Sequence, residues 1–293
     1  IKLADRLHNC RTIEFMPEHK RDKILSETMF VFIPLAHRLG LYGIKSEMED
    51  IWLRYKEPEA FNEITAKINR NINDKDKEIT DFIAPIDVAL KAAGFKYEIK
   101  KRVKTPYSIW NKMNNKGIAF DQIYDLYAVR IIFDPDVDSK ETERDQCYHV
   151  FSIITGLYRY KADRVRDWVN YPKNNGYEAL HCTLMSNAGF WIEVQIRSTR
   201  MNEVAEKGIA AHWAYKKNGF AEENESEMDK WITKVKDILV NPDVTALELL
   251  DMIHNDLIQT DIVVFTPKGE QKSIEKGATA LDFAYSIHSQ IGS

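Results

Sequence analysis

Cysteine is scarce in this sequence, and neither sign of charge is in large excess. The 293 residues include three cysteines, Cys10, Cys147 and Cys182, which are odd in number and far apart. This usage favours a reducing compartment such as the cytoplasm over a disulfide-stabilised secreted fold. Lysine and arginine total 41 against 45 aspartates and glutamates, a formal net charge of −4. That balance excludes a protein that binds nucleic acid through bulk positive charge, so any anion site must be local.

Long apolar runs are absent as well. No run of roughly 18 or more apolar residues occurs, so the sequence predicts no membrane-spanning helix. The opening IKLADRLHNC carries charge where the apolar core of a signal peptide would stand. There is no His-Asp dipeptide, no internal repeat and no low-complexity tract. The sequence opens with isoleucine in a helical pattern and ends within another element, and we interpret it as a piece of a longer protein.

The periodicity of the apolar residues changes along the chain. Apolar residues recur every three or four positions up to about residue 56, and a charged helical stretch follows to about Ala93, where Gly94 can cap it. Short β-branched and aromatic runs, separated by helical patterns, then predict strands at 125–133, 179–186 and 190–198. A polar, acidic stretch at 218–229 predicts a linker or the solvated start of a helix, and a strand–turn–strand–helix pattern begins near residue 261.

Positive charge gathers at the start of one predicted helix, in RVKTPYSIWNKM, residues 102–113. Thr105 is a favoured N-cap residue and Pro106 suits the first helical position. The free N–H groups and the positive dipole end of such a helix bind anions. The side chains that share one side of the helix or of the preceding extended segment are Ser108 with Lys112 and Arg102 with Lys104. The segment predicts a polyphosphate site; the alternative is a solvated basic helix start.

Two carboxylates are candidates for a magnesium site beside these cations. The strand WIEVQIR, residues 191–197, alternates strictly, so Val194 is expected in the core and Glu193 on a face that can line a site. Asp125 opens another predicted strand and is expected beside Glu193. Such a pair near a polyphosphate suits Mg²⁺, which takes oxygen ligands; strand-edge salt bridges are the alternative. Arg130 has the opposite parity to Asp125, so both face the site only if Asp125 lies outside the regular strand or a bulge intervenes.

Two further segments carry candidate binding residues. In PKNNGYEALH, residues 172–181, Tyr177 can stack on a base and His181 can contact phosphate, although such a tyrosine is more often a packing residue. In RVRDW, residues 164–168, a cationic cluster stands on a loop or helix end, where a solvated patch is the default interpretation.

Four segments, in this order and spacing, resemble the synthetase domain of the RelA/SpoT homologue family: RVKTPYSIWNKM, FDQIYDLYAVRIIF, NYPKNNGYEALH and WIEVQIRSTRMNEVAEKGIAAHWAYK. The opening IKLADRLHNCRTI resembles the last metal-ligand helix of that family's HD-type hydrolase domain, and the final 33 residues resemble the start of its TGS domain. The resemblance implies an α+β fold, a nucleotidyltransferase-like mixed β-sheet flanked by helices, with an all-α segment before it and the start of a β-grasp TGS domain after it. The implied domains are the end of the hydrolase domain with central helices (1–55), the synthetase domain (56–220), a helical linker (221–258) and the TGS start (259–293).

The resemblance also implies an activity, the transfer of the β,γ-pyrophosphate of ATP to the 3′-hydroxyl of GDP or GTP, which gives (p)ppGpp and AMP. The implied ATP-binding residues are Arg102, Lys104, Ser108, Lys112 and Arg130. The implied GDP- or GTP-binding residues are Lys173, Asn175, Tyr177, His181 and Gln195. Asp125 and Glu193 would be the catalytic pair: Asp125 would hold Mg²⁺, and Glu193 would share the ion or orient and deprotonate the attacking hydroxyl. RVRDW matches the basic form of a motif of this family. That form implies that the parent protein is bifunctional and that it prefers GDP as the acceptor.

On the hydrolase side, the resemblance makes Asp5 a remnant Mn²⁺ ligand and Asn9 and Thr12 nucleotide contacts. The family's other ligands would lie upstream of residue 1, so we expect this chain neither to bind Mn²⁺ nor to hydrolyse (p)ppGpp. The implied protein is cytoplasmic, with no membrane partner, and meets the ribosome and uncharged tRNA through its C-terminal region. The alternative function is a catalytically silent module that senses tRNA and the ribosome. The residues that favour an enzyme are Arg102, Lys104, Asp125, Tyr177 and Glu193.

Overall fold

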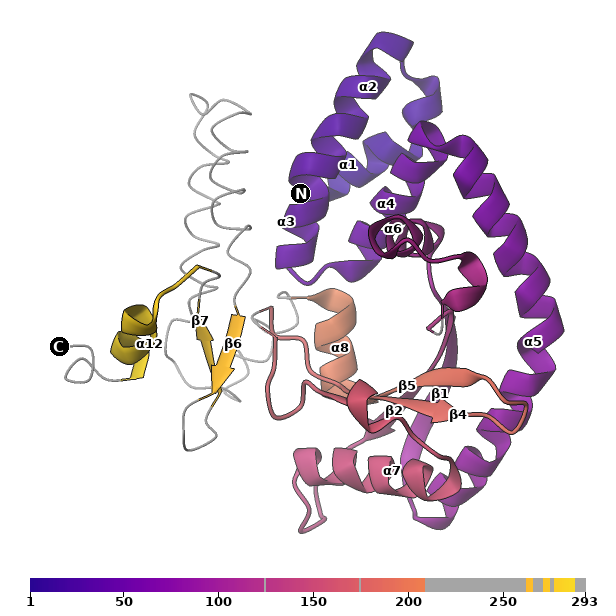
Figure 1. The fold of residues 1–293 in the computed structure, drawn as a ribbon, viewed down its shortest axis with the longest axis vertical. Helices are drawn as coiled ribbons and strands as arrows, with labels where there is room; N and C mark the ends of the chain where they lie inside the picture. Colours follow the sequence, from indigo (N-terminus) through magenta and orange to yellow (C-terminus); the bar gives the residue numbers. More distant parts are fainter. Residues whose placement is uncertain (124, 174, 209–261, 266–270, 275–276, 288–293) are drawn as a thin grey trace. The chain divides into compact units, whose positions relative to one another are not determined.

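The structure is a computed structural model (Figure 1), and it describes residues 1–123, 125–173, 175–208, 262–265, 271–274 and 277–287. The chain divides into two compact units, Ile1–Asn224 and Glu225–Ser293, and each is considered by itself. Among the described helices, none combines the length and the apolar content that crossing a bilayer requires. The predicted linker at 221–258 and the end of the predicted synthetase domain, 209–220, lie outside the described residues.

The first 56 residues form helices, as their apolar period predicts. These are α1 (Lys2–Arg11), η1 (Ile13–Phe15), α2 (Glu18–Glu27), the π-helical turn η2 (Thr28–Phe32), α3 (Ile33–Arg38) and α4 (Tyr42–Lys56). Their buried side chains, among them Leu7, Cys10, Met48 and Leu53, form the interior of this helical segment. The long helix α5 (Pro58–Ala92) follows, and Gly94 after it has a φ of +80°, which glycine adopts without steric cost. The predicted glycine stop is therefore confirmed.

A five-stranded mixed sheet forms the centre of the next part. Its strands are β1 (Lys96–Val103), β2 (Tyr127–Asp134), β3 (Arg166–Asp167), β4 (Leu180–Met185) and β5 (Trp191–Ser198), and their order is β1-β2-β5-β4-β3. Only β2 and β5 run parallel; the other pairs are antiparallel. The helices of this part are α6 (Pro106–Lys116), η3 (Phe120–Gln122), α7 (Glu143–Leu157), η4 (Ala162–Arg164) and α8 (Thr199–Lys207). The predicted α+β class with a mixed, helix-flanked sheet is confirmed.

The register of the sheet separates an apolar face from a polar one. Residues paired across neighbouring strands point to the same face. One face carries fully buried apolar side chains, including Val129, Ile131, Cys182, Val194 and Ile196, and packs against α5 and α7. The opposite face carries two polar rows: Arg102, Ala128, Glu193 and Thr183, then Lys100, Arg130, Gln195, His181 and Arg166. α8 lies over this polar face, and α7 lies on the other side of the sheet (Figure 1).

The helical segment is fixed to the polar face of the sheet domain through close contacts. Gly208, at the end of α8, has a φ of +61°, and a Cβ there would stand 2.3 Å from the carbonyl oxygen of Leu39. The turn between α3 and α4 therefore approaches α8 more closely than any other residue type would allow. Tyr42 of α4 accepts a hydrogen bond from the side-chain amide of Asn175 at 2.5 Å. The helical segment thus reaches the loop that the sequence assigns to the acceptor nucleotide.

The second unit contains the hairpin of β6 (Ile262–Phe265) and β7 (Gln271–Ile274), followed by α12 (Ala280–Ile287). Thr279 and Asp282 cap α12 reciprocally, since each backbone N–H donates to the other side chain. The predicted order of strand, strand and helix is confirmed, while the predicted turn at Pro267–Gly269 lies outside the described residues.

Candidate functional site

Helix α6 begins where the sequence predicts. Thr105 has extended backbone angles, its hydroxyl accepts a hydrogen bond from the N–H of Ser108, and it donates to the hydroxyl of Ser108 at 2.9 Å. Pro106 is the first helical residue, and Gly117, with a φ of +60°, ends the helix. Ser108 and Lys112 therefore both lie on α6, the helix that the local sequence signals predict.

The amino end of α6 does not offer free N–H groups to an anion. Pro106 has no N–H, and the N–H of Ser108 faces the Thr105 side chain. The N–H of Tyr107 donates to Oδ1 of Asp50 at 2.9 Å, and Asp50 belongs to α4. The expectation that these N–H groups bind polyphosphate is therefore wrong, because a carboxylate from the helical segment already accepts from the helix end. The cationic side chains of this segment remain the candidates for binding phosphate.

Asp50 makes the stability of the protein depend on pH. Burial raises the pKa of its carboxyl to about 6, and Glu49 adds to the rise although the Tyr107 N–H opposes it. Because the folded state holds this proton more tightly than the unfolded state, the contribution of Asp50 to stability falls as pH rises from about 4 through about 6. Asp50→Asn keeps an oxygen acceptor without the charge. We expect Asp50→Asn to unfold at a higher temperature than the wild type at pH 8, with the difference shrinking below pH 6.

Thermal unfolding followed by circular dichroism between pH 4 and pH 8 measures this effect. Asp50→Ala serves as the second variant, because it leaves the Tyr107 N–H without an acceptor and is expected to lower the midpoint at every pH. A difference between wild type and Asp50→Asn that does not change with pH would contradict the assignment.

Asp125 meets two of the predicted phosphate-binding lysines. It lies in the turn before β2, outside the regular strand, which satisfies the condition set by the parity of Arg130. Lys104 Nζ is 3.0 Å from Oδ2 of Asp125, and Lys112 Nζ donates to Oδ1. Burial alone would raise the pKa of Asp125, but the two ammonium groups outweigh it and lower the pKa to about 2. Asp125 is thus ionised at neutral pH and shares its charge with both lysines.

Glu193 lies on the polar face with its side chain held at one oxygen. Gln195 Nε2 donates to Oε1 of Glu193 at 2.6 Å, and His181 Nδ1 lies 3.6 Å from the same oxygen. Glu193 is opposite Ala128 of β2, and Asp125 precedes that strand by two residues, so both carboxylates lie at the amino ends of neighbouring parallel strands. The structure brings these predicted residues to one end of the sheet.

The lowered pKa of His181 reflects the positive charge around this face. Burial lowers the pKa of its imidazole, and four cations lower it further to about 3: Arg197, Lys173, Arg102 and Arg130. Arg130 donates through NH1 to Oε1 of Glu206 on α8 at 2.6 Å. A face with this excess of cations attracts polyanions. Binding of ATP by Arg102 and Arg130, which the resemblance implies, stays a prediction.

The ring of Tyr177 is covered in this structure and is not accessible to a nucleotide base. It is 8% exposed, and the Lys173 ammonium and the Arg197 guanidinium lie 5.1 Å and 4.8 Å from the centre of its ring. Asn175 accepts from the N–H of Tyr177 at 3.2 Å while its amide donates to Tyr42. Stacking of a base on Tyr177, which stays a prediction, therefore requires movement of Lys173 or Arg197 away from the ring.

The residues predicted to be a remnant of a hydrolase site lie on α1 and at the position after it. Asn9 donates to Asp5 at 3.5 Å, one turn earlier on an exposed face, and the Thr12 hydroxyl donates to the carbonyl of His8. Within the described ranges, no group of three or more histidine, cysteine, aspartate or glutamate side chains is arranged to hold a metal. Asp5 is accordingly a surface carboxylate here.

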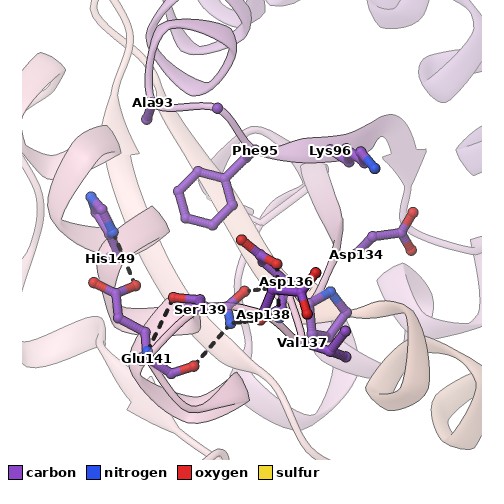
Figure 2. Close-up of a pocket in the computed structure, with 13 residues that line it drawn as sticks. Ala93, Phe95, Lys96, Asp134, Asp136, Val137, Asp138, Ser139, Glu141 and His149 are labelled. Carbon is purple, nitrogen blue, oxygen red and sulfur yellow. Dashed lines mark hydrogen bonds and ion pairs between the residues drawn. The ribbon is translucent and has the colours of Figure 1, made fainter.

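A cavity of about 520 Å³ lies at the opposite end of β2, away from Asp125. Its walls come from the turn after α5, the segment after β2 and the start of α7 (Figure 2). Acidic side chains such as Asp134, Asp136 and Asp138 gather there, and Glu141 pairs with His149. None of the predicted site residues lines this cavity, so it is separate from the candidate site.

Sequence reasoning missed four residues at the site: Tyr42, Asp50, Arg197 and Glu206. Arg197 had a signal, since it shares the polar side of the alternating strand with Glu193 and Gln195. The other three act across long separations in sequence, as Asp50 does on Tyr107, and no local pattern marks them.

Three regions of the chain match models of known protein families. Residues 101–220 match the model of the region found in RelA / SpoT proteins, residues 262–293 match the TGS domain, and residues 1–42 match an HD domain. The candidate site falls almost entirely within the first of these matches.

Whole-chain relatives are also found. A GTP pyrophosphokinase of Myxococcus xanthus is 38% identical over the whole chain, which spans 37% of that relative. A guanosine-3′,5′-bis(diphosphate) 3′-pyrophosphohydrolase of Aquifex aeolicus is 35% identical, again over the whole chain and 40% of the relative. The crystal structure of small alarmone synthetase 1 of Bacillus subtilis bound to pppGpp is 19% identical and covers 56% of this chain and 100% of its own, with a TM-score of 0.32. The chain thus spans about two fifths of the curated relatives that it matches, and it belongs to the RelA/SpoT family.

Proposed function

We propose that the chain carries a GTP/GDP pyrophosphokinase, which transfers the β,γ-pyrophosphate of ATP to the 3′-hydroxyl of GDP or GTP. The observation that carries this proposal is the placement of Asp125 and Glu193 at the amino ends of adjacent parallel strands, on a face rich in cations. Relatives named GTP pyrophosphokinase, 34–38% identical over the whole chain, support it. No contact among the described residues favours the catalytically silent alternative.

The donor nucleotide is assigned to the α6 side of the site. Lys104 and Lys112 meet at Asp125, and a triphosphate placed there gains two point charges within a partly buried setting. Ser108 is on the same helix as Lys112, and Arg102 and Arg130 stand on the adjoining polar face. These side chains hold and align the phosphates, and alignment with charge neutralisation supplies most of the catalysis in phosphoryl-type transfer.

The acceptor nucleotide is assigned to the opposite side, beside Tyr177, Asn175, His181, Lys173 and Gln195. Glu193 accepts a hydrogen bond from Gln195 at Oε1, and among the described residues none donates to Oε2. Glu193 can therefore take the proton of the 3′-hydroxyl at Oε2. The 3′-oxygen forms a bond to the β-phosphorus, the bond from that phosphorus to the α–β bridging oxygen breaks, and AMP leaves with that oxygen.

The carboxylates suit Mg²⁺. Asp125 is ionised and would hold the ion, while Glu193, whose Oε2 is the proposed base, lies at the amino end of the neighbouring strand; hard oxygen ligands such as Asp125, completed by phosphate oxygens and water, are what Mg²⁺ takes. When bound, the ion supplies positive charge that neutralises the reacting phosphates. The hydrolase ion, Mn²⁺, is not expected on Asp5, since no described side chains complete a site there.

The remaining assignments follow from the family. We assign 1–55 to the end of the hydrolase domain with central helices, 56–220 to the synthetase domain, 221–258 to a helical linker and 259–293 to the start of the TGS domain. The matched TGS segment supports contacts of the whole protein with uncharged tRNA and the ribosome, in the cytoplasm.

Incubation of the chain, and of the whole protein, with ATP, GDP and Mg²⁺ tests this function. AMP and ppGpp are separated by ion-exchange chromatography, and equal amounts of the two are expected, with neither formed when GDP is omitted or Mg²⁺ is chelated. AMP without ppGpp, or neither product from either protein, would contradict the proposal.

A further inference from the structure

Arg197 is a buried cation without a carboxylate partner in the part of the chain that the structure describes. It lies in β5, is 2% exposed, and its Nε has no hydrogen-bond partner among the described groups. A buried charge that lacks a counterion is costly to keep. The fold therefore retains Arg197 at the expense of stability, which is typical of a residue kept for function.

The two hydrogen bonds of Arg197 have fixed directions. Its NH2 group donates to the hydroxyl of Tyr177 and, at 3.1 Å, to Oε1 of Gln195. Arginine has donors only, so both oxygens accept. The Tyr177 hydroxyl must then direct its own hydrogen elsewhere, and Nε2 of His181 lies 2.7 Å away. Gln195 is likewise oriented so that its amide nitrogen donates to Glu193.

These directions indicate one tautomer of His181. Nε2 accepts from the Tyr177 hydroxyl and therefore carries no proton of its own, so the imidazole is in its neutral form. The single ring proton therefore resides on Nδ1, the nitrogen 3.6 Å from Oε1 of Glu193. One donor chain runs from Arg197 through Tyr177 to His181, whose Nδ1 lies 3.6 Å from Oε1, beyond hydrogen-bond distance. A second runs from Arg197 through Gln195 and ends in a hydrogen bond to the same oxygen.

We propose that Arg197 is a positioning residue that heads both donor chains, fixes Oε1 of Glu193 and thereby presents Oε2 to the acceptor hydroxyl. The role given to Oε2 rests on the proposed function. The orientation of Tyr177 and the tautomer of His181 do not depend on it, since they follow from the hydrogen bonds alone.

The first test is spectroscopic and needs no activity. The chain labelled with ¹⁵N-histidine is examined by long-range ¹H–¹⁵N correlation spectra, with His181 assigned by its loss in His181→Asn. The wild type is expected to show the Nδ1–H tautomer at His181. Arg197→Met, of similar length and without donors, and Tyr177→Phe, which removes only one chain, are both expected to lose that preference. Arg197→Lys, which keeps donors, is expected to restore part of it.

The second test is kinetic, on the same variants. Arg197→Met is expected to lower kcat by up to about 100-fold, since small displacements of a reacting group have effects of that size. KM for ATP is expected to stay within about twofold of the wild type, because the lysines at Asp125 are untouched. Arg197→Lys should recover part of kcat. Arg144→Met, an exposed arginine of α7, is the matched control and should leave the tautomer and kcat unchanged.

Several outcomes would overturn the inference. An Nδ1–H tautomer that survives in Arg197→Met contradicts it, as does a loss of kcat without any change at His181. A thermal midpoint for Arg197→Met well below that of the wild type would contradict the view that Arg197 is kept at a cost in stability. If the wild type transfers no pyrophosphate, the proposed function fails, while the tautomer in the variants still decides the role of Arg197.

Discussion

Replacing Glu193 with Gln is expected to abolish pyrophosphate transfer and to leave the domain folded. The side chain lies on the polar face of β5, where an amide has the same shape and its oxygen can still accept from Gln195. What is lost is the negative charge and the ability to take the proton of the hydroxyl. General base catalysis contributes about 10²- to 10⁴-fold to such reactions, so we expect kcat to fall by about a thousandfold. The rate of AMP release in the presence of GDP measures the change.

Glu98→Gln provides the matched control. Glu98 belongs to β1 and pairs with Ile132 of β2. It stands two residues before Lys100 in the strand, so its side chain points to the same polar face as Lys100 and Arg130. The substitution makes the same change of charge in the same sheet, at an exposed position paired only with Lys100. We expect full activity and an unchanged unfolding midpoint. Retention of more than about a tenth of the wild-type rate in Glu193→Gln would rule out Glu193 as the base, since that exceeds the residual rate expected without one.

Local patterns in the sequence predicted the elements that carry the site. Thr105 and Pro106 predicted the start of α6, and the strict alternation of residues 191–197 predicted which side chains of β5 face the core. Both are short-range effects: capping acts within one helical turn, and the two faces of a strand alternate with every residue. Signals of this kind survive in any tertiary context, which is why these predictions held.

Contacts across the fold were beyond such patterns. Asp50 reaches Tyr107 across 57 positions, and Tyr42 reaches Asn175 across 133. Nothing in the residues around Asp50 marks it as an acceptor for another helix, so α6 was predicted to hold phosphate at an end that is already satisfied. The resemblance to a family supplied candidate residues but not their present partners, such as Lys104 and Lys112 at Asp125.

The short strand β3 shows a related limit. Its two residues, Arg166 and Asp167, have no alternation to detect. Asp167 is held by the backbone N–H groups of Val169 and Asn170 and by the Tyr148 hydroxyl of α7, so tertiary contacts fix this segment. The cationic cluster RVRDW was accordingly visible in the sequence while its place at the edge of the sheet was not.

Replacing Val194 with Asp is expected to prevent the domain from folding. Val194 is 0% exposed and lies between Val129 of β2 and Cys182 of β4, both also fully buried. No cation among the described side chains is available on that face, so the carboxylate must be buried unpaired or protonated. The expected cost of several kcal/mol is comparable to the whole stability of a typical domain, about 5–15 kcal/mol. Loss of the cooperative thermal transition, followed by circular dichroism, is the measurement.

Val194→Thr separates the effect of polarity from that of shape. Threonine has nearly the shape of valine and adds one hydroxyl, so we expect a folded domain with a lower midpoint than the wild type. The comparison with Glu193→Gln then tests the two faces of one strand at adjacent positions, since one substitution should remove activity and the other should remove the fold. If Val194→Asp and Glu193→Gln folded equally well, Val194 would not lie in the core, and the assignment of Glu193 to the catalytic face would fall with it.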